Sequence, residues 1–338
     1  MKFSQAPLIL SALVVCSFTL HATENAPVIT GSDSSASDSA SQEGELAKQI
    51  NNPVAALISV PFQANDDFHL GPTHQGNKFT LNIQPVIPIS ISPDWNLIVR
   101  TILPIVSQHD LYYVNVPPYP GLPDKILDQV PASQRAAAEE QGRSLYDNFI
   151  KDNPQNRSQD GFGDTTQSFF LSPKQPGWEG IIWGLGPVFY YPTATQDLLG
   201  AGKWGVGPTA VALKQTNGWT IGMLANQIWS IDGQKSRNNV NSTFLQPFIT
   251  YTTKTYTSFG INTESSYNWQ ASQWTVPINL TISQVFKIAG QPMSVQLGAR
   301  YYAQSSGPAY GHGVWGARLN FTLLFPLHRA PAETAMVK

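Results

Sequence analysis

The sequence predicts an all-β protein, a transmembrane antiparallel up-and-down β-barrel of about twelve strands with a long helix-containing external loop. Three observations predict it: tryptophans at segment ends, alternating apolar and polar residues, and links of alternating length. The tryptophans are Trp95, Trp178, Trp183, Trp204, Trp219, Trp229, Trp269, Trp274 and Trp315. Because an indole ring prefers the membrane–water interface, we expect all of these except Trp178 to form the two aromatic girdles of a barrel.

The bulk composition fits a barrel better than a helical membrane protein. Apolar residues make up 41% of the 338 residues, and no apolar run is long enough for a spanning helix. In a barrel, lipid-facing and lumen-facing residues alternate, so the mean hydropathy stays near neutral. Charged residues are 12% and the net charge is −2, which gives no electrostatic footprint for binding nucleic acid.

The first residues have the pattern of a secretory signal peptide, residues 1–22, with Lys2 ahead of an apolar stretch and cleavage after Ala22. The one cysteine, Cys16, lies inside it. A lipoprotein would be acylated at Cys16, but Val15 is bulky for that processing site. Residues 23–44 are rich in Ser, Ala and Asp and predict a disordered periplasmic leader. Residues 43–52 predict one or two helical turns with Leu46 and Ile50 on one face, or a frayed approach to the first strand.

Strands of period-two alternation follow along residues 45–327, the predicted barrel. We expect them at about 54–62, 78–91, 96–106, 161–172, 180–191, 204–215, 220–231, 242–251, 256–268, 274–287, 292–304 and 314–326. The last shows the pattern clearly, since Leu319, Phe321 and Leu323 alternate with Asn320 and Thr322.

The predicted links sort by length. Those after even-numbered strands are short, and those after odd-numbered strands are mostly longer: 63–77, 107–160, 192–203, 232–241, 269–273 and 305–313, of which only 269–273 is ambiguous. Short periplasmic turns and longer external loops are typical of outer-membrane barrels. An even strand count places both termini in the periplasm of a Gram-negative bacterium, with residues 328–338 as a tail.

Prolines oppose the strand assignment. Eight lie inside predicted strands, and each removes a ladder hydrogen bond that a closed barrel cannot hide at a free edge: Pro61, Pro85, Pro88, Pro104, Pro187, Pro208, Pro247 and Pro277. We expect them at bulges, near strand ends or outside the true strands.

The link 107–160 is long enough to have a function of its own. Ser133 is the expected N-cap of a helix that continues through Glu139 and Glu140. The helix either folds into the barrel mouth as a lid or decorates the outside.

Short motifs give the chain a family resemblance. They are NPVAALISVPFQ from Asn52, NIQPVIP from Asn82, DWNLI from Asp94, GFGDT from Gly161, GLGP from Gly184, PTAT from Pro192 and GVGPT from Gly205. With these motifs, residues 45 to 327 resemble the meta-pathway phenol-degradation family of bacterial outer-membrane proteins. The resemblance implies a barrel that passes small compounds, aromatic or apolar ones among them. The insertion 107–160 and the tail after Phe325 depart from the family pattern.

Charged side chains inside strands are few, and alternation directs several of them to the lumen. The lumen candidates are Arg100, Asp164, Glu264, Arg300 and Arg318; an arginine facing lipid at mid-depth would cost about 2–4 kcal/mol. If residue 304 lies beside 314, Arg300 lies directly across from Arg318, and either a carboxylate, with Glu264 or Asp164 as the candidates, or a bound anion must lie between them. The cluster is either a constriction that selects permeants or a salt-bridge network that plugs the barrel.

Three function classes remain open: a channel or transporter for a small permeant, a non-conducting structural or adhesive barrel, and an outer-membrane hydrolase. A hydrolase needs a serine beside a histidine, yet the histidines all fall in predicted links or the tail: His69, His74, His109, His312 and His328. His69 and His74 with Asp66 and Asp67 form either a metal site or a solvated loop. We predict no catalytic residue, cofactor or metal. The expected surroundings are outer-membrane lipid and lipopolysaccharide, while the oligomeric state is not predicted.

Overall fold

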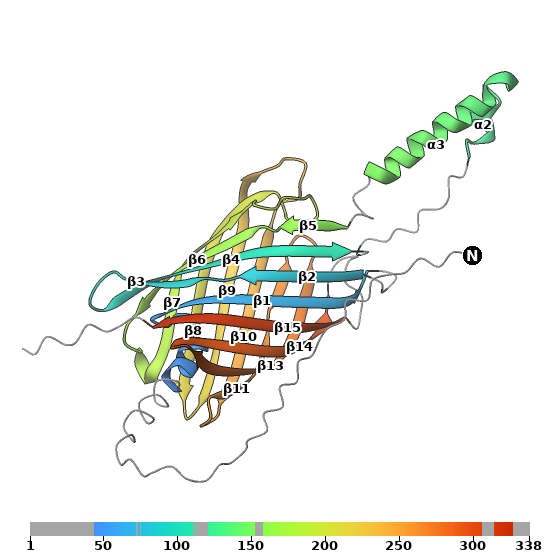
Figure 1. Cartoon of the computed structure of the whole chain (residues 1–338). Coiled ribbons are helices and arrows are strands. Elements are labelled where there is room, and N and C mark those ends of the chain that lie inside the picture. The colour runs from blue at the N-terminus through green and yellow to red at the C-terminus, as the bar shows by residue number, and fades with distance from the viewer. Residues whose placement is uncertain are drawn as a thin grey trace, which may run out of the picture.

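The computed structural model describes residues 44–71, 74, 76–109, 111, 121–152, 158–305 and 314–326. Within them, antiparallel strands close into one barrel (Figure 1). Strand β1 (Leu57–Leu70) closes it by pairing with the last strand, β15 (Trp315–Pro326), from Leu57 opposite Pro326 to Phe68 opposite Trp315. The predicted fold class is therefore confirmed.

The other segments follow one another around the wall in sequence order. They are β2 (Gly76–Ile83), β3 (Val86–Ser90), β4 (Trp95–His109), β5 (Gln159–Phe162), β6 (Thr165–Pro173), β7 (Ile181–Tyr191), β8 (Lys203–Thr216), β9 (Trp219–Gly233), β10 (Asn241–Thr252), β11 (Thr257–Thr263), β12 (Ser265–Asn268), β13 (Gln273–Ile288) and β14 (Gln291–Gln304). The pairs β2/β3, β5/β6 and β11/β12 are each one interrupted strand, so the described residues form twelve barrel strands.

The first predicted strand ends too early. Strand β1 continues through residues 63–70, and the predicted long link 63–77 is a short one between Leu70 and Gly76. Its polar residues Gln63, Asn65 and Asp67 suggested a loop, but they alternate with Ala64, Asp66 and Phe68 and point to the polar lumen. A strand between lipid and a polar lumen needs only one apolar face.

The interruptions coincide with prolines. Pro85 lies in the break between β2 and β3, and the Pro104 carbonyl accepts a hydrogen bond from the Gly163 amide in the break between β5 and β6. The break between β11 and β12 is the single residue Glu264, which lies between Pro247 and Pro277 on the neighbouring strands. Each break carries one polar residue: Gln84 and Glu264 line both lumen cavities, and Asp164 is buried. The other four prolines lie inside continuous strands, contrary to the expectation that they would lie at bulges, near strand ends or outside the strands: Pro61, Pro88, Pro187 and Pro208.

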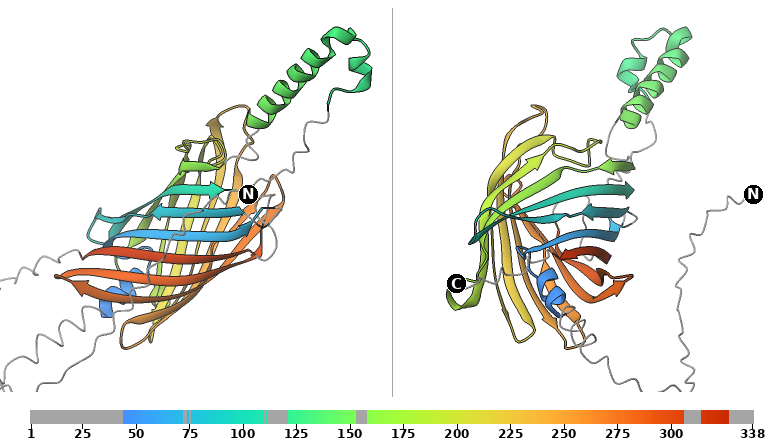
Figure 2. Two further views of the ribbon diagram at one scale, coloured as in Figure 1. Left: turned by 45° about the vertical axis from the view of Figure 1, so that its right-hand side comes forward. Right: turned by 60° about the vertical axis from the view of Figure 1, so that its left-hand side comes forward.

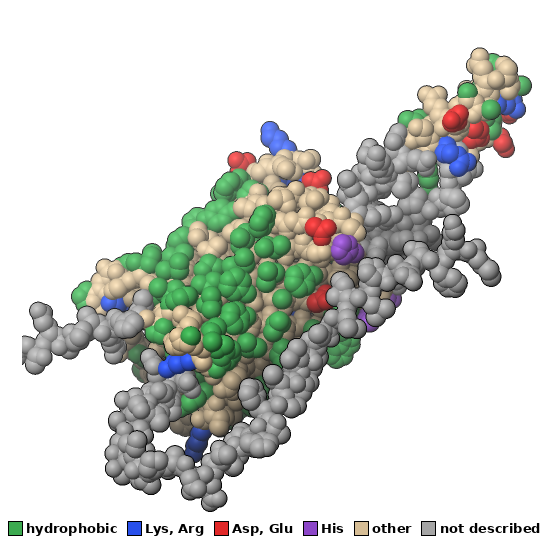
Figure 3. Space-filling view, in the orientation of Figure 1, with side chains coloured by type: hydrophobic (Ala, Val, Ile, Leu, Met, Phe, Trp, Pro, Cys, Tyr) green, Lys and Arg blue, Asp and Glu red, His purple; other side chains and the backbone are tan. Residues whose placement is uncertain are grey.

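The outside of the barrel is apolar. Large side chains such as Ile221, Met223, Leu280, Leu297 and Leu319 are about half exposed. Figure 3 shows hydrophobic side chains gathered over the barrel wall on the face in view. Such a surface suits lipid rather than water. No helix among the described residues is both long and apolar enough to cross a membrane.

The tryptophans lie toward the two ends of this surface. Trp95, Trp178, Trp183 and Trp219 are at the end with the short turns, and Trp204, Trp229, Trp269, Trp274 and Trp315 are toward the end with the long loops. Several pack against another aromatic ring. Trp95 and Trp183, for example, meet edge to face with 5.9 Å between their ring centroids.

A helical segment, residues 44–50, lies in the short-turn mouth (Figure 2). Leu46 and Ala47 are buried there against Leu57, Val285 and Leu324, and Ile50 packs against the same cluster. The predicted helical turns with Leu46 and Ile50 on one face are therefore present, and their apolar face anchors the chain inside the mouth.

The long link contains the helix α2 (Asp124–Leu127), the 3₁₀ turn η1 (Ala132–Gln134) and the helix α3 (Arg135–Asp152). Ser133 lies inside η1 and does not act as the predicted cap, because the chain enters the helix through this turn. In Figures 1 and 2 α3 extends away from the barrel, and none of residues 121–152 lines a lumen cavity. The arrangement favours the external position over the lid. Residues 1–43 and 327–338, with the predicted signal peptide, Cys16, most of the leader and the tail, lie outside the described residues, as does His312.

Candidate functional site: the lumen constriction

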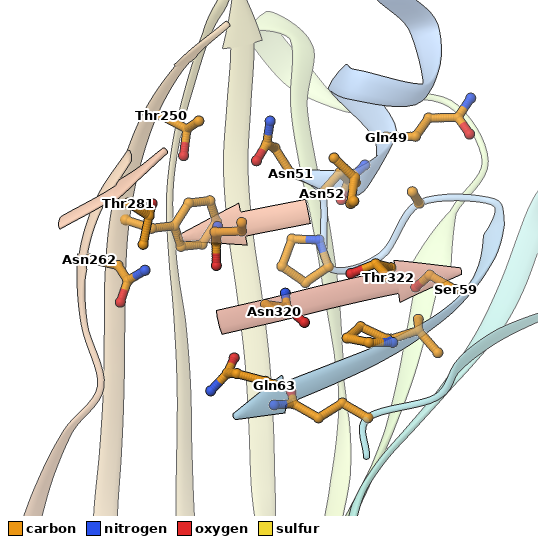
Figure 4. A pocket seen from close by; sticks show the side chains of 18 of the residues that line it. Gln49, Asn51, Asn52, Ser59, Gln63, Thr250, Asn262, Thr281, Asn320 and Thr322 are labelled. Atoms are coloured by element: carbon orange, nitrogen blue, oxygen red, sulfur yellow. The ribbon is translucent and has the colours of Figure 1, made fainter. Parts of the chain in front are cut away.

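Two cavities occupy the lumen and meet at one layer of side chains. A cavity of about 210 Å³ lies on the short-turn side, and one of about 390 Å³ lies on the long-loop side. Five residues line both: Gln63, Gln84, Arg100, Gln246 and Glu264. We call this layer the constriction. Figure 4 shows the smaller cavity, where Asn51 and Asn52 of the N-terminal segment face polar side chains of the wall, such as Asn320.

Glu264 is the centre of the charged network. Its two carboxylate oxygens accept hydrogen bonds from the two terminal nitrogens of Arg318, at 2.9 and 2.7 Å. Arg318 also donates its Nε to Asn65 Oδ1 at 2.7 Å and is almost completely buried. A bidentate arginine–carboxylate pair is strong and fixes the orientation of both groups.

Arg300 joins the network from β14, the neighbour of the strand that carries Arg318. Its terminal nitrogens lie 3.7 Å from Asp67 Oδ2 and 3.7 Å from Glu264 Oε2. Its guanidinium also lies 5.0 Å from the ring centroid of Tyr302, whose hydroxyl donates to Asp67 at 2.8 Å. Asp67 was missed as a lumen residue because the sequence placed it in a loop; the alternation that continues past Gln63 is the signal that could have found it.

The predicted register between the last two strands is wrong by two residues. Arg318 lies opposite Gly298, and Arg300 lies opposite Gly316, so the two arginines are diagonal neighbours and not directly across from each other. The ladder between β14 and β15 ends at Tyr301 opposite Trp315. Beyond it the Tyr302 amide donates to the Val314 carbonyl at 3.0 Å, and Gln304 pairs with Val276 of β13. A two-residue shift keeps every side chain on its face, so both arginines still point inward.

Arg100 reaches the constriction from strand β4. Its terminal nitrogen donates to Gln84 Oε1 at 2.9 Å, and Gln84 lies in the break between β2 and β3. Arg100 has no ion pair with a carboxylate among the described residues, because both oxygens of Glu264 are already bound by Arg318.

Asp164 is not part of this network, contrary to the prediction that it could join the arginines. It accepts hydrogen bonds from the Tyr190 hydroxyl at 2.7 Å, the Ala194 amide at 3.0 Å and the Ala201 amide at 2.6 Å. Asp164 therefore fixes the loop between β7 and β8. It lies nearer the long-loop end of the barrel than the constriction does.

The histidines are not all in links, which corrects the sequence interpretation. His69 lies in β1 and His109 in β4, where its Nε2 is 3.0 Å from Ser107 Oγ on the outer face. Asn77 of β2 lies opposite His109 and donates its side-chain amide to Asp66 Oδ1 at 2.8 Å, and among the described residues no acid or amide is hydrogen-bonded to the His109 ring. Asp66 and Asp67 point to opposite faces of β1, so they cannot act together in the metal site considered with His69 and His74, and the described residues contain no metal-binding group of three.

Comparisons with known proteins support the fold. No family model matches the chain, and no curated protein matches its sequence. Among solved structures it is similar to the COG4313 outer membrane channel from Pseudomonas putida F1, with 15% identity, a TM-score of 0.52, and coverage of 81% of this chain and 96% of that one. It is more weakly similar to outer membrane phospholipase A from Escherichia coli, with 9% identity, a TM-score of 0.41, and coverage of 84% and 97%. At these identities the likeness extends to the fold alone.

Proposed function

We propose that the protein is an outer-membrane channel for small compounds, aromatic or apolar ones among them, with its termini in the periplasm. The observation that carries the proposal is the pair of lumen cavities that meet at one thin layer of side chains. A plugged structural barrel would need no cavity on either side of its salt bridges. The sequence resemblance to the phenol-degradation family supports the choice of permeant, and the apolar outer band suits contact with lipid and lipopolysaccharide.

The lumen surface suits a hydrated path. Asn279 Oδ1, Asn320 Oδ1 and Asp67 Oδ1 are buried without a hydrogen-bond partner among the described residues. Buried polar atoms ordinarily have a partner, so we expect water to bind them. The constriction then sets the width and charge of the path, as rings of side chains do in other pores.

Single-channel conductance in planar bilayers tests the proposal. Gln63 and Gln246 are uncharged members of the constriction, so Gln63→Ala with Gln246→Ala should widen it and raise the conductance several-fold without changing its charge. Gln296→Ala is the matched control, because Gln296 lines only the smaller cavity and its truncation should change the conductance much less.

Folding is checked on the same preparations, since a closed barrel keeps every backbone group satisfied and should migrate faster before boiling than after it on a cold SDS gel. Folded protein without conductance steps, in the wild type and in the widened variant alike, would rule out the channel.

A further inference from the structure

We propose that Arg100 forms, with the cavity on the long-loop side, a binding site for a small organic anion with an apolar body, of which an aromatic carboxylate is the simplest example. The inference rests on the proposed function and deepens it, because it names the permeant class that the lumen would retain. It depends on three features of the constriction: the charge balance, the pairing of each arginine, and the apolar wall beside Arg100.

The constriction network carries one more positive than negative charge. Arg100, Arg300 and Arg318 are balanced by Glu264 and Asp67 alone. Arg318 is bound at both oxygens of Glu264, and Arg300 lies 3.7 Å from each of the two acids. The excess charge therefore belongs to Arg100, which donates to the neutral amide of Gln84.

A cation taken out of water is costly unless an anion or several hydrogen bonds compensate it. Arg100 lines both cavities, so its guanidinium is accessible from the lumen on either side of the constriction. A planar guanidinium matches a carboxylate with two parallel hydrogen bonds. Gln84, which receives one Arg100 hydrogen bond, would keep the guanidinium oriented for this partner.

The larger cavity supplies an apolar surface next to this charge. Ile102, Leu224, Ile228, Val240 and Phe244 line it. The rest of the lining is polar and includes Arg100 and Glu264, whose carboxylate is bound by Arg318. Its volume of about 390 Å³ lies in the range of about 300–1,000 Å³ that is typical of small-molecule sites. An inorganic anion would leave the apolar wall unused, and an organic cation would be repelled by Arg100. A ring or short chain that carries one carboxylate uses both features.

Equilibrium binding to the purified, folded full-length protein in detergent micelles tests the site independently of transport. The probes are radiolabelled benzoate and two compounds of similar size, neutral benzamide and cationic benzylammonium. We expect saturable binding of benzoate. The affinity for benzamide should be lower by about tenfold or more, because a charge-assisted hydrogen bond is lost. Benzylammonium should show no saturable binding.

Three variants assign the binding to its residues. Arg100→Gln should weaken benzoate binding about tenfold or more, and Arg100→Lys should keep part of it, because the charge remains while the planar pair is lost. Phe244→Ala should weaken benzoate binding. The chloride concentration needed to displace benzoate should stay the same as in the wild type. Each variant must show the heat-dependent gel mobility of a closed barrel.

Equal benzoate binding by wild type and Arg100→Gln, or equal binding of benzoate and benzamide, would overturn the proposal. Displacement of benzoate by chloride at equal concentration would show an anion site without the apolar component and would overturn it as well. Benzoate binding without any bilayer conductance would support the site and reject the channel, whereas conductance without benzoate binding would do the reverse.

Discussion

Glu264 and Asp164 are acidic residues at similar positions in their strands, but they bind different kinds of partner. Each is an acid in the break of an interrupted strand. Glu264 lies among arginines from other strands, whereas Asp164 is held by a hydroxyl and two backbone amides of one loop. The height of a break along the barrel decides whether its polar side chain meets charges or a loop.

The most direct way to break this comparison is to remove each charge while keeping the shape. Glu264→Gln should destabilise the barrel by about 3–5 kcal/mol, because Arg318 stays buried without a compensating charge. Asp164→Asn should cost less, about 1–3 kcal/mol, since its donors are neutral and one carbonyl acceptor remains. The measurement is the temperature at which the fast-migrating form disappears on a cold SDS gel.

Equal losses for the two variants would show that both acids serve only as hydrogen-bond acceptors and would contradict the charged role of Glu264. Glu264→Asp is a useful companion variant, because it keeps the charge and shortens the reach to Arg318. It should fall between the wild type and Glu264→Gln.

A smaller change sharpens the other half of the comparison. Tyr190→Phe removes one hydrogen bond to Asp164 and should loosen the loop between β7 and β8 by about 1 kcal/mol. Limited proteolysis of intact vesicles should then cleave within residues 192–202 faster than in the wild type, while the conductance stays the same. Tyr191→Phe is the control, since Tyr191 donates instead to Gln167. Equal cleavage of wild type and Tyr190→Phe would remove Asp164 from the control of this loop.

The sequence was sufficient for the strand faces but not for the partners across the lumen. Alternation placed Arg300, Arg318 and Glu264 on the inner face, because period two survives any even shift in register. The two-residue error between Arg300 and Arg318 arose because the end of a hairpin ladder depends on how the loop leaves the strand. The loop lengths predicted the up-and-down order of the strands, because short links join strands that are neighbours in the barrel wall.

Other features depended on tertiary context. Asp67 was hidden by the polar residues that surround it in β1, and only the lumen makes that polarity compatible with a strand. The prolines in the sequence argued against continuous strands. In the structure, four of them lie at or beside the breaks that contain Gln84, Asp164 and Glu264: Pro85, Pro104, Pro247 and Pro277. The position of residues 44–50 in one mouth depends on the apolar pocket formed by strands from both ends of the chain.

Ion selectivity tests the central claim most directly, that the charges of the constriction face a conducting path. The reversal potential in a salt gradient should show a preference for anions in the wild type, because Arg100, Arg300 and Arg318 outnumber Glu264 and Asp67 in the charged network at and beside the constriction. Arg300→Ala with Arg318→Ala should reverse the preference toward cations, and Arg300→Ala alone, which keeps the Arg318–Glu264 pair, should shift it part of the way. An unchanged reversal potential in folded, conducting variants would contradict the account, as would a lower thermal stability of the double variant with no conductance in any form, the result expected of a plugged barrel.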